Sequence, residues 1–169
     1  AAHERATSSR LKERMPGVYV SLSSEVLPHI KEYERVSTTA VNAYVGPVLE
    51  RYLSQLEGRL RSAGYEGPAL ITLSHGGVTP IDEAVRLAAG TVLSGPAGGL
   101  AGARHAGDLL KLDQIITFDM GGTSSDISLI VDGEATLSAD RTVAGEKIAL
   151  SSLDIVTLGA GGGSIAWAS

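Results

Sequence analysis

The chain has 169 residues, a formal net charge of −5, 43% hydrophobic residues, 21 glycines and no cysteine. This length suits one domain with a real core, and the acidic balance argues against a nucleic-acid surface, which needs clustered Lys and Arg. The absence of cysteine excludes disulfides and thiolate zinc sites. The sequence has no secretory pattern and no apolar run near the roughly 20 residues of a membrane span, so we expect a cytoplasmic protein without a membrane partner.

Residues 1–36 are predicted to form a partial N-terminal connecting segment ahead of the core. A charged, polar stretch ends at Pro16-Gly17 and predicts a short helix over residues 1–15. The apolar run at residues 18–22 predicts a strand. Pro28 then breaks a connecting segment.

A long helix is the next predicted element. Residues 37–39 offer Ser and Thr as capping candidates, Gly64 is the expected stop, and Pro47 should kink or interrupt the helix. Apolar side chains recur at intervals of three and four, which indicates one helical face. They are Val41, Tyr44, Val45, Val48, Leu49, Tyr52, Leu53, Leu56 and Leu60.

A strand and a helix are predicted on either side of a Gly-rich turn. Residues 69–73 have the length and apolarity of a buried strand, and residues 79–89 begin with Thr-Pro-Ile-Asp, which is typical of a helix start. The turn at residues 74–77 lies where ligands gather in α/β folds. Its His75 is expected to make a structural hydrogen bond.

Residues 93–102 form a glycine-rich stretch before an Ala-rich helix that runs to about Leu110. The stretch matches a dinucleotide fingerprint poorly, because Pro96 interrupts the tight turn and no acidic residue follows a second strand about 20 residues later. Two interpretations stay open. Either the small residues pack the helix closely on the sheet, or N–H groups around Gly98 and Gly99 face a nucleotide.

Two strands joined by a tight turn are predicted over residues 115–131. Apolar β-branched runs flank the turn, and its two glycines lack a Cβ, so an anion can approach the backbone N–H groups. The hydroxyl residues that follow add further donors. The phosphate-binding candidates are Gly121, Gly122, Thr123, Ser124 and Ser125.

An aspartate lies at each end of this turn, Asp119 before it and Asp126 after it. Two carboxylates suit a magnesium ion that keeps most of its waters while it bridges to nucleotide phosphates. The alternative is a Gly-rich hairpin in which the aspartates only cap turns.

The C-terminal part is predicted to be mostly extended. Residues 135–138 return as a third strand after a turn at Asp132-Gly133, residues 140–147 form a polar loop, and residues 148–158 are extended. This segment leads to the glycine run at residues 159–163.

The glycine run has four glycines in five residues, and so many glycines lose much conformational entropy on folding. One reason for such a run is close approach of the backbone to a ligand, which makes Gly161 and Gly162 candidate nucleotide contacts. The other interpretation is a flexible linker.

The segment at residues 119–126, Asp-Met-Gly-Gly-Thr-Ser-Ser-Asp, resembles the second phosphate loop of the actin, Hsp70 and sugar kinase ATPase superfamily. Its amino-acid sequence is most similar to that of the hydantoinase A/5-oxoprolinase family. Four further segments resemble that family in order, at residues 36–44, 74–77, 93–99 and 159–166. The chain departs from the family at His75, where Asn is usual, and near Ser169, where an acidic residue is usual.

The resemblance implies an α/β fold, a ribonuclease-H-like lobe with a mixed sheet, an antiparallel hairpin meander and flanking helices. Residues 1–169 would be a single central lobe with its core at residues 37–169. The superfamily binds nucleotide between two lobes, and its first phosphate loop and its adenosine segment are not found here. We therefore expect an internal fragment that is inactive alone, because catalysis needs donors on all sides of the transferring phosphate.

The resemblance further implies an ATP-dependent hydrolase of cyclic amides, of the hydantoin or 5-oxoproline type, that uses ATP and Mg²⁺. Asp119 and Asp126 would be the catalytic and magnesium-binding residues, and the turn between them would hold the phosphates. A nucleotide, a small cyclic amide and a hydantoinase B-like subunit would be the partners. Alternatives are a related ketone carboxylase subunit, a kinase-like phosphotransferase and a non-catalytic scaffold lobe.

Overall fold

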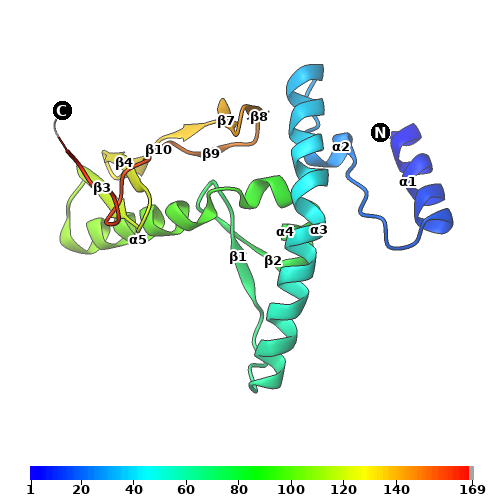
Figure 1. Ribbon diagram of the computed structural model, residues 1–169, viewed down its shortest axis with the longest axis horizontal. Coiled ribbons are helices and arrows are strands. Elements are labelled where there is room, and N and C mark those ends of the chain that lie inside the picture. The colour runs from blue at the N-terminus through cyan, green and yellow to red at the C-terminus, as the bar shows by residue number, and fades with distance from the viewer. Residues whose placement is uncertain (168–169) are drawn as a thin grey trace.

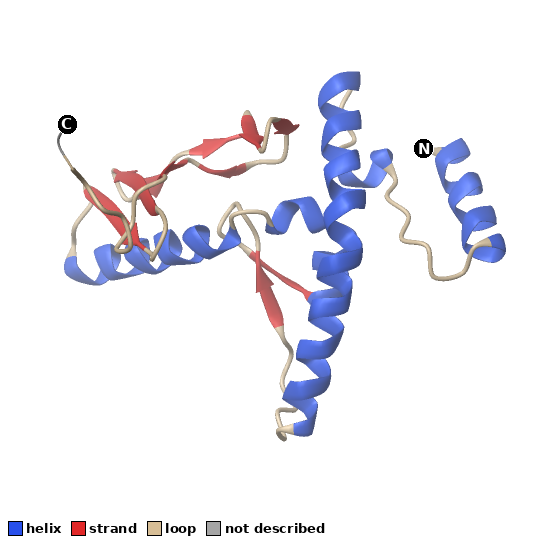
Figure 2. Ribbon diagram, viewed as in Figure 1, coloured by secondary structure: helices blue, strands red, loops and turns tan. Residues whose placement is uncertain are grey.

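The computed structural model describes residues 1–167 (Figures 1 and 2). Its helices are α1 (Ala2–Arg14), α2 (Ser23–Val26), α3 (Glu32–Ser62), α4 (Ile81–Arg86), the 3-10 helix η1 (Ala88–Thr91) and α5 (Ser94–Leu110). Its strands are β1 (Leu70–Thr72), β2 (Val78–Pro80), β3 (Ile115–Met120), β4 (Ser125–Val131), β5 (Glu134–Ala135), β6 (Leu137–Ser138), β7 (Arg141–Val143), β8 (Glu146–Ile148), β9 (Ser152–Leu153) and β10 (Ile155–Leu158). Among the described residues, no helix combines the length and apolarity that a bilayer crossing requires.

The strands form one four-stranded sheet and three two-stranded ribbons. In the sheet, β4 lies between β3 and β10, and β5 pairs with the far end of β4. The ribbons are β1–β2, β6–β9 and β7–β8. The α/β class and the antiparallel hairpin with flanking helices are confirmed. Every pairing within residues 1–167 is antiparallel, so these residues do not form the parallel pairing that a mixed sheet requires.

The strand expected at residues 69–73 forms as β1, but it pairs with β2 instead of joining the sheet. It is not fully buried, since Leu70 is 53% exposed. Thr79 and Pro80, expected at the start of a helix, end β2, and α4 begins at Ile81. Proline is tolerated there because an edge strand needs no N–H donor on its outer side.

Helix α5 covers one face of the sheet and forms the core with it (Figure 1). The buried side chains are Ala97, Leu100, Ile130, Leu153 and Ile155, and Ile115 packs against them. On the opposite face, Ile116, Phe118 and Leu129 are each more than half exposed. The sheet thus has one helical layer, on the α5 side. The third strand expected at residues 135–138 is divided between β5, on this sheet, and β6, which pairs with β9.

Helix α3 crosses the chain beyond the end of α5, with the β1–β2 ribbon beside its lower half and β7–β8 near its upper half (Figure 1). It begins at Glu32, five residues before the expected caps, and it continues through Pro47 without the expected interruption. The expected capping hydroxyls bind distant backbone instead: Ser37 Oγ donates to the Lys147 carbonyl at 2.7 Å, and Thr38 Oγ1 accepts from the Ala149 N–H at 3.0 Å. The predicted stop is confirmed, since α3 ends at Ser62 and Gly64 has a φ of +86°.

The buried face of α3 is more polar than the predicted apolar stripe. Tyr44 and Val48 from that stripe are 85% and 65% exposed, whereas Asn42 is fully buried. The Asn42 amide donates to Ser21 Oγ at 2.9 Å and to the Arg86 carbonyl at 3.1 Å. Its Oδ1 accepts from the Ala89 N–H at 2.9 Å. One side chain therefore ties α3 to the N-terminal segment and to the end of α4.

The strand predicted at residues 18–22 does not form. This segment has no regular secondary structure and pairs with no strand within residues 1–167. Tyr19 holds it against α3 and α4 instead: a Cβ on Gly46 would overlap the Tyr19 ring, and the Tyr19 hydroxyl donates to the Val85 carbonyl at 2.5 Å. An aromatic side chain that packs on a glycine of a helix thus replaces the expected pairing.

Helix α1 is attached to the rest of the fold through the Glu4 carboxylate. This carboxylate accepts from Ser23 Oγ at 2.5 Å, from the Ser24 N–H at 3.0 Å and from Arg35 Nη2 at 3.0 Å. These donors, first of all the Ser23 hydroxyl, lower the pKa of Glu4 from 4.5 to about 2. A carboxyl whose pKa falls on folding stabilises the fold in its ionised form.

We expect Glu4→Gln to lower the free energy of unfolding at neutral pH, because the amide loses the charge that these donors stabilise. The difference between wild type and variant should be constant above pH 4.5 and should shrink as the pH falls from 4.5 toward about 2, where wild-type Glu4 becomes protonated. Thermal unfolding between neutral pH and about pH 3 measures this difference. Glu13→Gln, on the exposed face of α1, is the matched control. A Glu4→Gln difference that stays the same at every pH would contradict the assignment.

Candidate functional site

The hairpin predicted over residues 115–131 forms as β3 and β4, and both strands extend further than expected. Only residues 121–124 lie outside the strands, and the Gly121 N–H closes this turn by donating to the Ser124 carbonyl at 2.9 Å. Asp119 and Asp126 therefore lie within strands. They are direct partners in the antiparallel register, and such partners project from the same face of a sheet.

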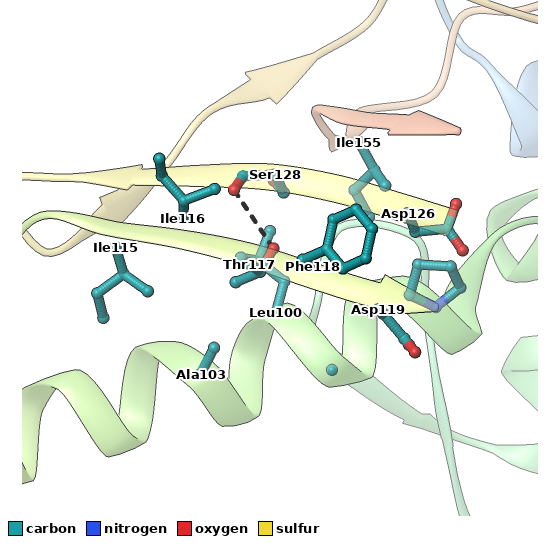
Figure 3. A pocket seen from close by; sticks show the side chains of 12 residues that line it. Leu100, Ala103, Ile115, Ile116, Thr117, Phe118, Asp119, Asp126, Ser128 and Ile155 are labelled. Carbon is teal, nitrogen blue, oxygen red and sulfur yellow. Dashed lines mark hydrogen bonds between the residues drawn. The ribbon is translucent and has the colours of Figure 1, made fainter. Parts of the chain in front are cut away.

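The sheet face toward α5 changes from apolar to polar along its length (Figure 3). Ile115 and Ile130 are register partners at the apolar end, and Asp119 and Asp126 are partners at the other end. A cavity of about 350 Å³ lies between α5 and the hairpin, and both aspartates line it. The acidic pair thus faces open space beside a packed core.

The two carboxylates have different surroundings. Asp126 is half-buried, and its Oδ1 accepts from Thr157 Oγ1 at 2.5 Å, because Thr157 on β10 is its register partner. Asp119 is exposed and makes no hydrogen bond to another side chain within residues 1–167. Thr157 was not among the predicted site residues, since a threonine in a short apolar strand gives no sign of which strand it will pair with.

No group of three or more His, Cys, Asp and Glu side chains gathers into a metal site within residues 1–167. A pair of carboxylates fits Mg²⁺ nonetheless, because this ion usually keeps several waters and takes only one or two protein carboxylates. The donor set at Asp119 and Asp126 is therefore compatible with magnesium and does not form an all-protein cage.

The turn presents three consecutive backbone donors. The N–H groups of Gly122, Thr123 and Ser124 donate to no acceptor in the part of the chain that the structure describes. Successive free N–H groups in a turn are typical of anion sites. Ser125 differs from the prediction: it is 2% exposed, and its hydroxyl donates to the Ala160 carbonyl at 2.7 Å. Its hydroxyl therefore links the end of the turn to the glycine run and is not available to a ligand.

The glycine run lies against this turn. Gly162 donates its N–H to the Gly121 carbonyl at 3.0 Å, and Gly163 donates to the Gly122 carbonyl at 2.8 Å. The run is therefore packed on the turn and is not a free linker at this point. The Gly162 N–H is already used by the turn, while Gly161 lies directly over it.

Gly98 and Gly99 were expected to lie before the helix, but they lie within it, because α5 already begins at Ser94. From the fifth residue of a helix onward, N–H groups bond within the helix. A Cβ on Gly99 would lie 3.8 Å from Asp119 Oδ2, and one on Gly98 would lie 3.9 Å from Thr72 Cγ2. A Cβ at either position would therefore fit in ordinary van der Waals contact, and the N–H groups of both glycines are used within α5.

His75 makes the structural hydrogen bond expected of it. Its Nδ1 accepts from the Gly77 N–H at 3.1 Å and so braces the turn at residues 74–77. His75 does not line the cavity beside the aspartates but a smaller one on the other side of α5, together with Arg104 and His105. The turn at residues 74–77 and the turn at residues 121–124 therefore do not line one cavity.

Residues 35–169 match the sequence profile of a family described as hydantoinase/oxoprolinase. The chain is 36% identical over 165 residues to the caprolactamase subunit alpha from Pseudomonas jessenii, a match that covers 98% of this chain and 24% of that protein. It is 37% identical over 164 residues to the 5-oxoprolinase from Saccharomyces cerevisiae, with 96% and 12% covered.

Solved structures show the same fold. The crystal structure of the ATP-dependent caprolactamase from Pseudomonas jessenii superposes with a TM-score of 0.78 at 32% identity and covers 99% of this chain and 24% of that chain. The nucleotide-free structure of acetone carboxylase also gives a TM-score of 0.78, at 29% identity, with 94% and 22% covered. The chain therefore spans about a quarter or less of the length of these relatives.

Proposed function

The chain belongs to the hydantoinase/oxoprolinase family, and we propose that it supplies one phosphate-binding lobe of an ATP-dependent enzyme that opens a cyclic amide. Relatives named for caprolactam and for 5-oxoproline, both cyclic amides, support this substrate class. The substrate is proposed to be a ring of the hydantoin or 5-oxoproline type.

The observation that carries the proposal is the turn between the acidic partners. Gly122, Thr123 and Ser124 present free N–H groups, and Asp119 and Asp126 flank them on one sheet face. Backbone amides can bind phosphate without a basic patch, which suits a chain of net charge −5. Two carboxylates beside the amides add a place for the divalent cation that accompanies ATP.

Each residue then has a distinct role. The three N–H groups of the turn would bind terminal phosphate oxygens, and the Thr123 and Ser124 hydroxyls would add donors. Asp119 would hold Mg²⁺ or its waters, and Asp126, oriented by Thr157, would position water beside it. Bound magnesium would neutralise phosphate charge.

ATP is needed because an amide carbon is a poor electrophile. We propose that the amide oxygen attacks the γ-phosphorus, so that the bond from the γ-phosphorus to the ADP oxygen breaks while a bond to the amide oxygen forms. Water then adds to the activated carbon, the ring C–N bond breaks as the nitrogen takes a proton, and a second water hydrolyses the resulting acyl phosphate to release phosphate. Positioned donors around the phosphate supply most of the rate in such transfers.

A related ketone carboxylase is the second candidate, because the acetone carboxylase structure superposes as well as the caprolactamase structure. In that reaction an enol oxygen would accept the phosphate. The same turn and the same acidic pair would serve both reactions.

We expect the full-length protein to release ADP and phosphate from ATP about tenfold faster or more when its cyclic amide is present. The assay would compare hydantoin, 5-oxoproline and caprolactam with acetone plus bicarbonate, and would identify the product by mass spectrometry. A ring-opened amino acid supports the proposal. Stimulation by ketone and bicarbonate alone would show that the protein is a ketone carboxylase. Transfer of phosphate to a hydroxyl or a carboxylate would show a kinase-like phosphotransferase. A protein that does not bind ATP would be a non-catalytic scaffold.

A further inference from the structure

The segment at residues 160–164 packs against the turn at residues 121–124, to which the proposed function assigns phosphate binding. Besides the two N–H donations from the glycine run, the Ala160 carbonyl accepts from Ser125 Oγ. The segment is itself closed, because Ser164 Oγ accepts from the Gly161 N–H at 3.0 Å and the Ser164 N–H donates to the Gly161 carbonyl at 2.9 Å. A tight turn thus supports the phosphate turn from one side.

Gly161 lies at the closest point of this contact. A Cβ added to Gly161 would be 2.7 Å from the Gly121 carbonyl oxygen. It would also be 2.8 Å from the backbone nitrogens of Thr123 and Ser124. All three atoms are backbone, so no side-chain rotation relieves the overlap, and either the phosphate turn (residues 121–124) or the segment at residues 160–164 would have to shift.

The other glycines of the run form a graded series. A Cβ on Gly163 would lie 3.0 Å from the Gly122 carbonyl oxygen, which is tight, and a Cβ on Gly159 would meet nothing within 4 Å. None of these three glycines has a positive φ. Alanine at each site therefore tests space alone, without a difference in backbone strain.

The same stretch of chain also reaches the acidic pair. Strand β10 pairs with β4 from Leu158↔Ser125 to Ile155↔Ser128, and it brings Thr157 to Asp126. Gly161 follows only four residues after Thr157. The orientation of one carboxylate and the shape of the amide turn are thus set by one short segment.

We propose that Gly161 is a positioning residue for nucleotide: its missing side chain lets residues 160–164 hold the amides of Thr123 and Ser124 in the arrangement that binds phosphate. This inference rests on the proposed function and assigns to the glycine run a role that acts through the turn. The run needs glycine at position 161 for space and not for flexibility.

We expect Gly161→Ala in the full-length protein to raise the KM for ATP and the Kd for an unhydrolysable ATP analogue by about 10- to 100-fold, as displacement of positioned groups by about 1 Å does. Gly163→Ala should raise both a few-fold, and Gly159→Ala should leave both within about twofold. The KM for the cyclic amide should change little in all three variants, whereas the overlap should lower the melting temperature most in Gly161→Ala. Calorimetry, steady-state kinetics and thermal unfolding measure these quantities.

The order of the three variants decides the inference. A purely flexible run would respond equally to alanine at all three positions, and such a result would overturn it, as would an unchanged ATP affinity in Gly161→Ala. If Gly161→Ala does not fold, the comparison of Gly163→Ala with Gly159→Ala carries the same test. Failure of wild-type protein to bind ATP would overturn the proposed function together with this inference, whereas ATP binding insensitive to position 161 would overturn the inference alone.

Discussion

Replacement of Asp119 by alanine should reduce ATP turnover of the full-length protein by about 100- to 1,000-fold, the usual loss when one electrostatic contact to a reacting group is removed. Asp119 borders the cavity and is the partner of Asp126 in the register. Its removal would leave the proposed magnesium ion with one carboxylate. The amides of the turn would remain in place, so nucleotide affinity should fall less than turnover.

The fold should tolerate this change. Asp119 is exposed and makes no side-chain hydrogen bond within the described residues, and surface substitutions of this kind stay within about 0.5 kcal/mol. Asp113→Ala, which removes an exposed aspartate just ahead of β3, is the matched control and should retain full turnover. Phosphate release and a melting curve measured on both variants give the comparison. Wild-type turnover in Asp119→Ala would refute the assignment.

Replacement of Asn42 by leucine is expected to produce the largest loss of stability, about 2–4 kcal/mol, because it orphans several buried polar groups at once. The Ala89 N–H and the Arg86 carbonyl would lose their partner in a site where Asn42 is fully buried. Leucine keeps the branched shape of asparagine and is somewhat larger, so a cavity would not explain the loss. A buried amide therefore matters more to α3 than its exposed apolar side chains.

The matched control is Gln55→Leu, an amide-to-leucine change at an exposed position of the same helix. It should change stability by no more than about 0.5 kcal/mol. Calorimetry on the full-length protein gives the melting temperatures, and hydrogen–deuterium exchange at residues 86–89 should show faster exchange in Asn42→Leu only. Equal melting temperatures and equal exchange in the two variants would show that the Asn42 hydrogen bonds add no net stability.

The hairpin at the site could be predicted from the sequence because its signals are local. Two apolar, β-branched runs and a Gly-Gly turn specify two paired strands within 17 residues, 115–131. The pairing of Asp119 with Asp126 follows from that turn. The end of α3 was equally predictable, since Gly64 adopts the positive φ typical of a helix stop.

The errors arose where distant contacts outweigh local preference. Ser37 and Thr38 are good capping residues, yet their hydroxyls bind Lys147 and Ala149, more than 100 residues away, so α3 begins earlier. The predicted strand at residues 18–22 had the right composition but no neighbour to pair with. Local propensity specifies an element, whereas its partner depends on the whole fold.

The site shows the same division. The turn and its two aspartates could be predicted from neighbouring residues in the sequence. The contact of Thr157 with Asp126 could not, because it depends on the pairing of β10 with β4. The glycine run was recognised as unusual, and its position over the turn could not be read from spacing. Gly98 and Gly99 were placed ahead of α5, because an N-terminus at Ser94 with Leu93 in a left-handed conformation has no clear sequence signal.

The contact between the phosphate turn and the glycine run bears on how the protein is made. Gly121 leaves the ribosome about 40 residues ahead of Gly161, so the nascent hairpin exists for a time without the segment that shapes it. Closing such a distant pair is slow compared with forming the hairpin itself. A chain halted in translation before Gly161 would therefore carry the turn at residues 121–124 and both acids without the segment that packs on the turn, and on the proposed function it would bind ATP weakly until the glycine run docks.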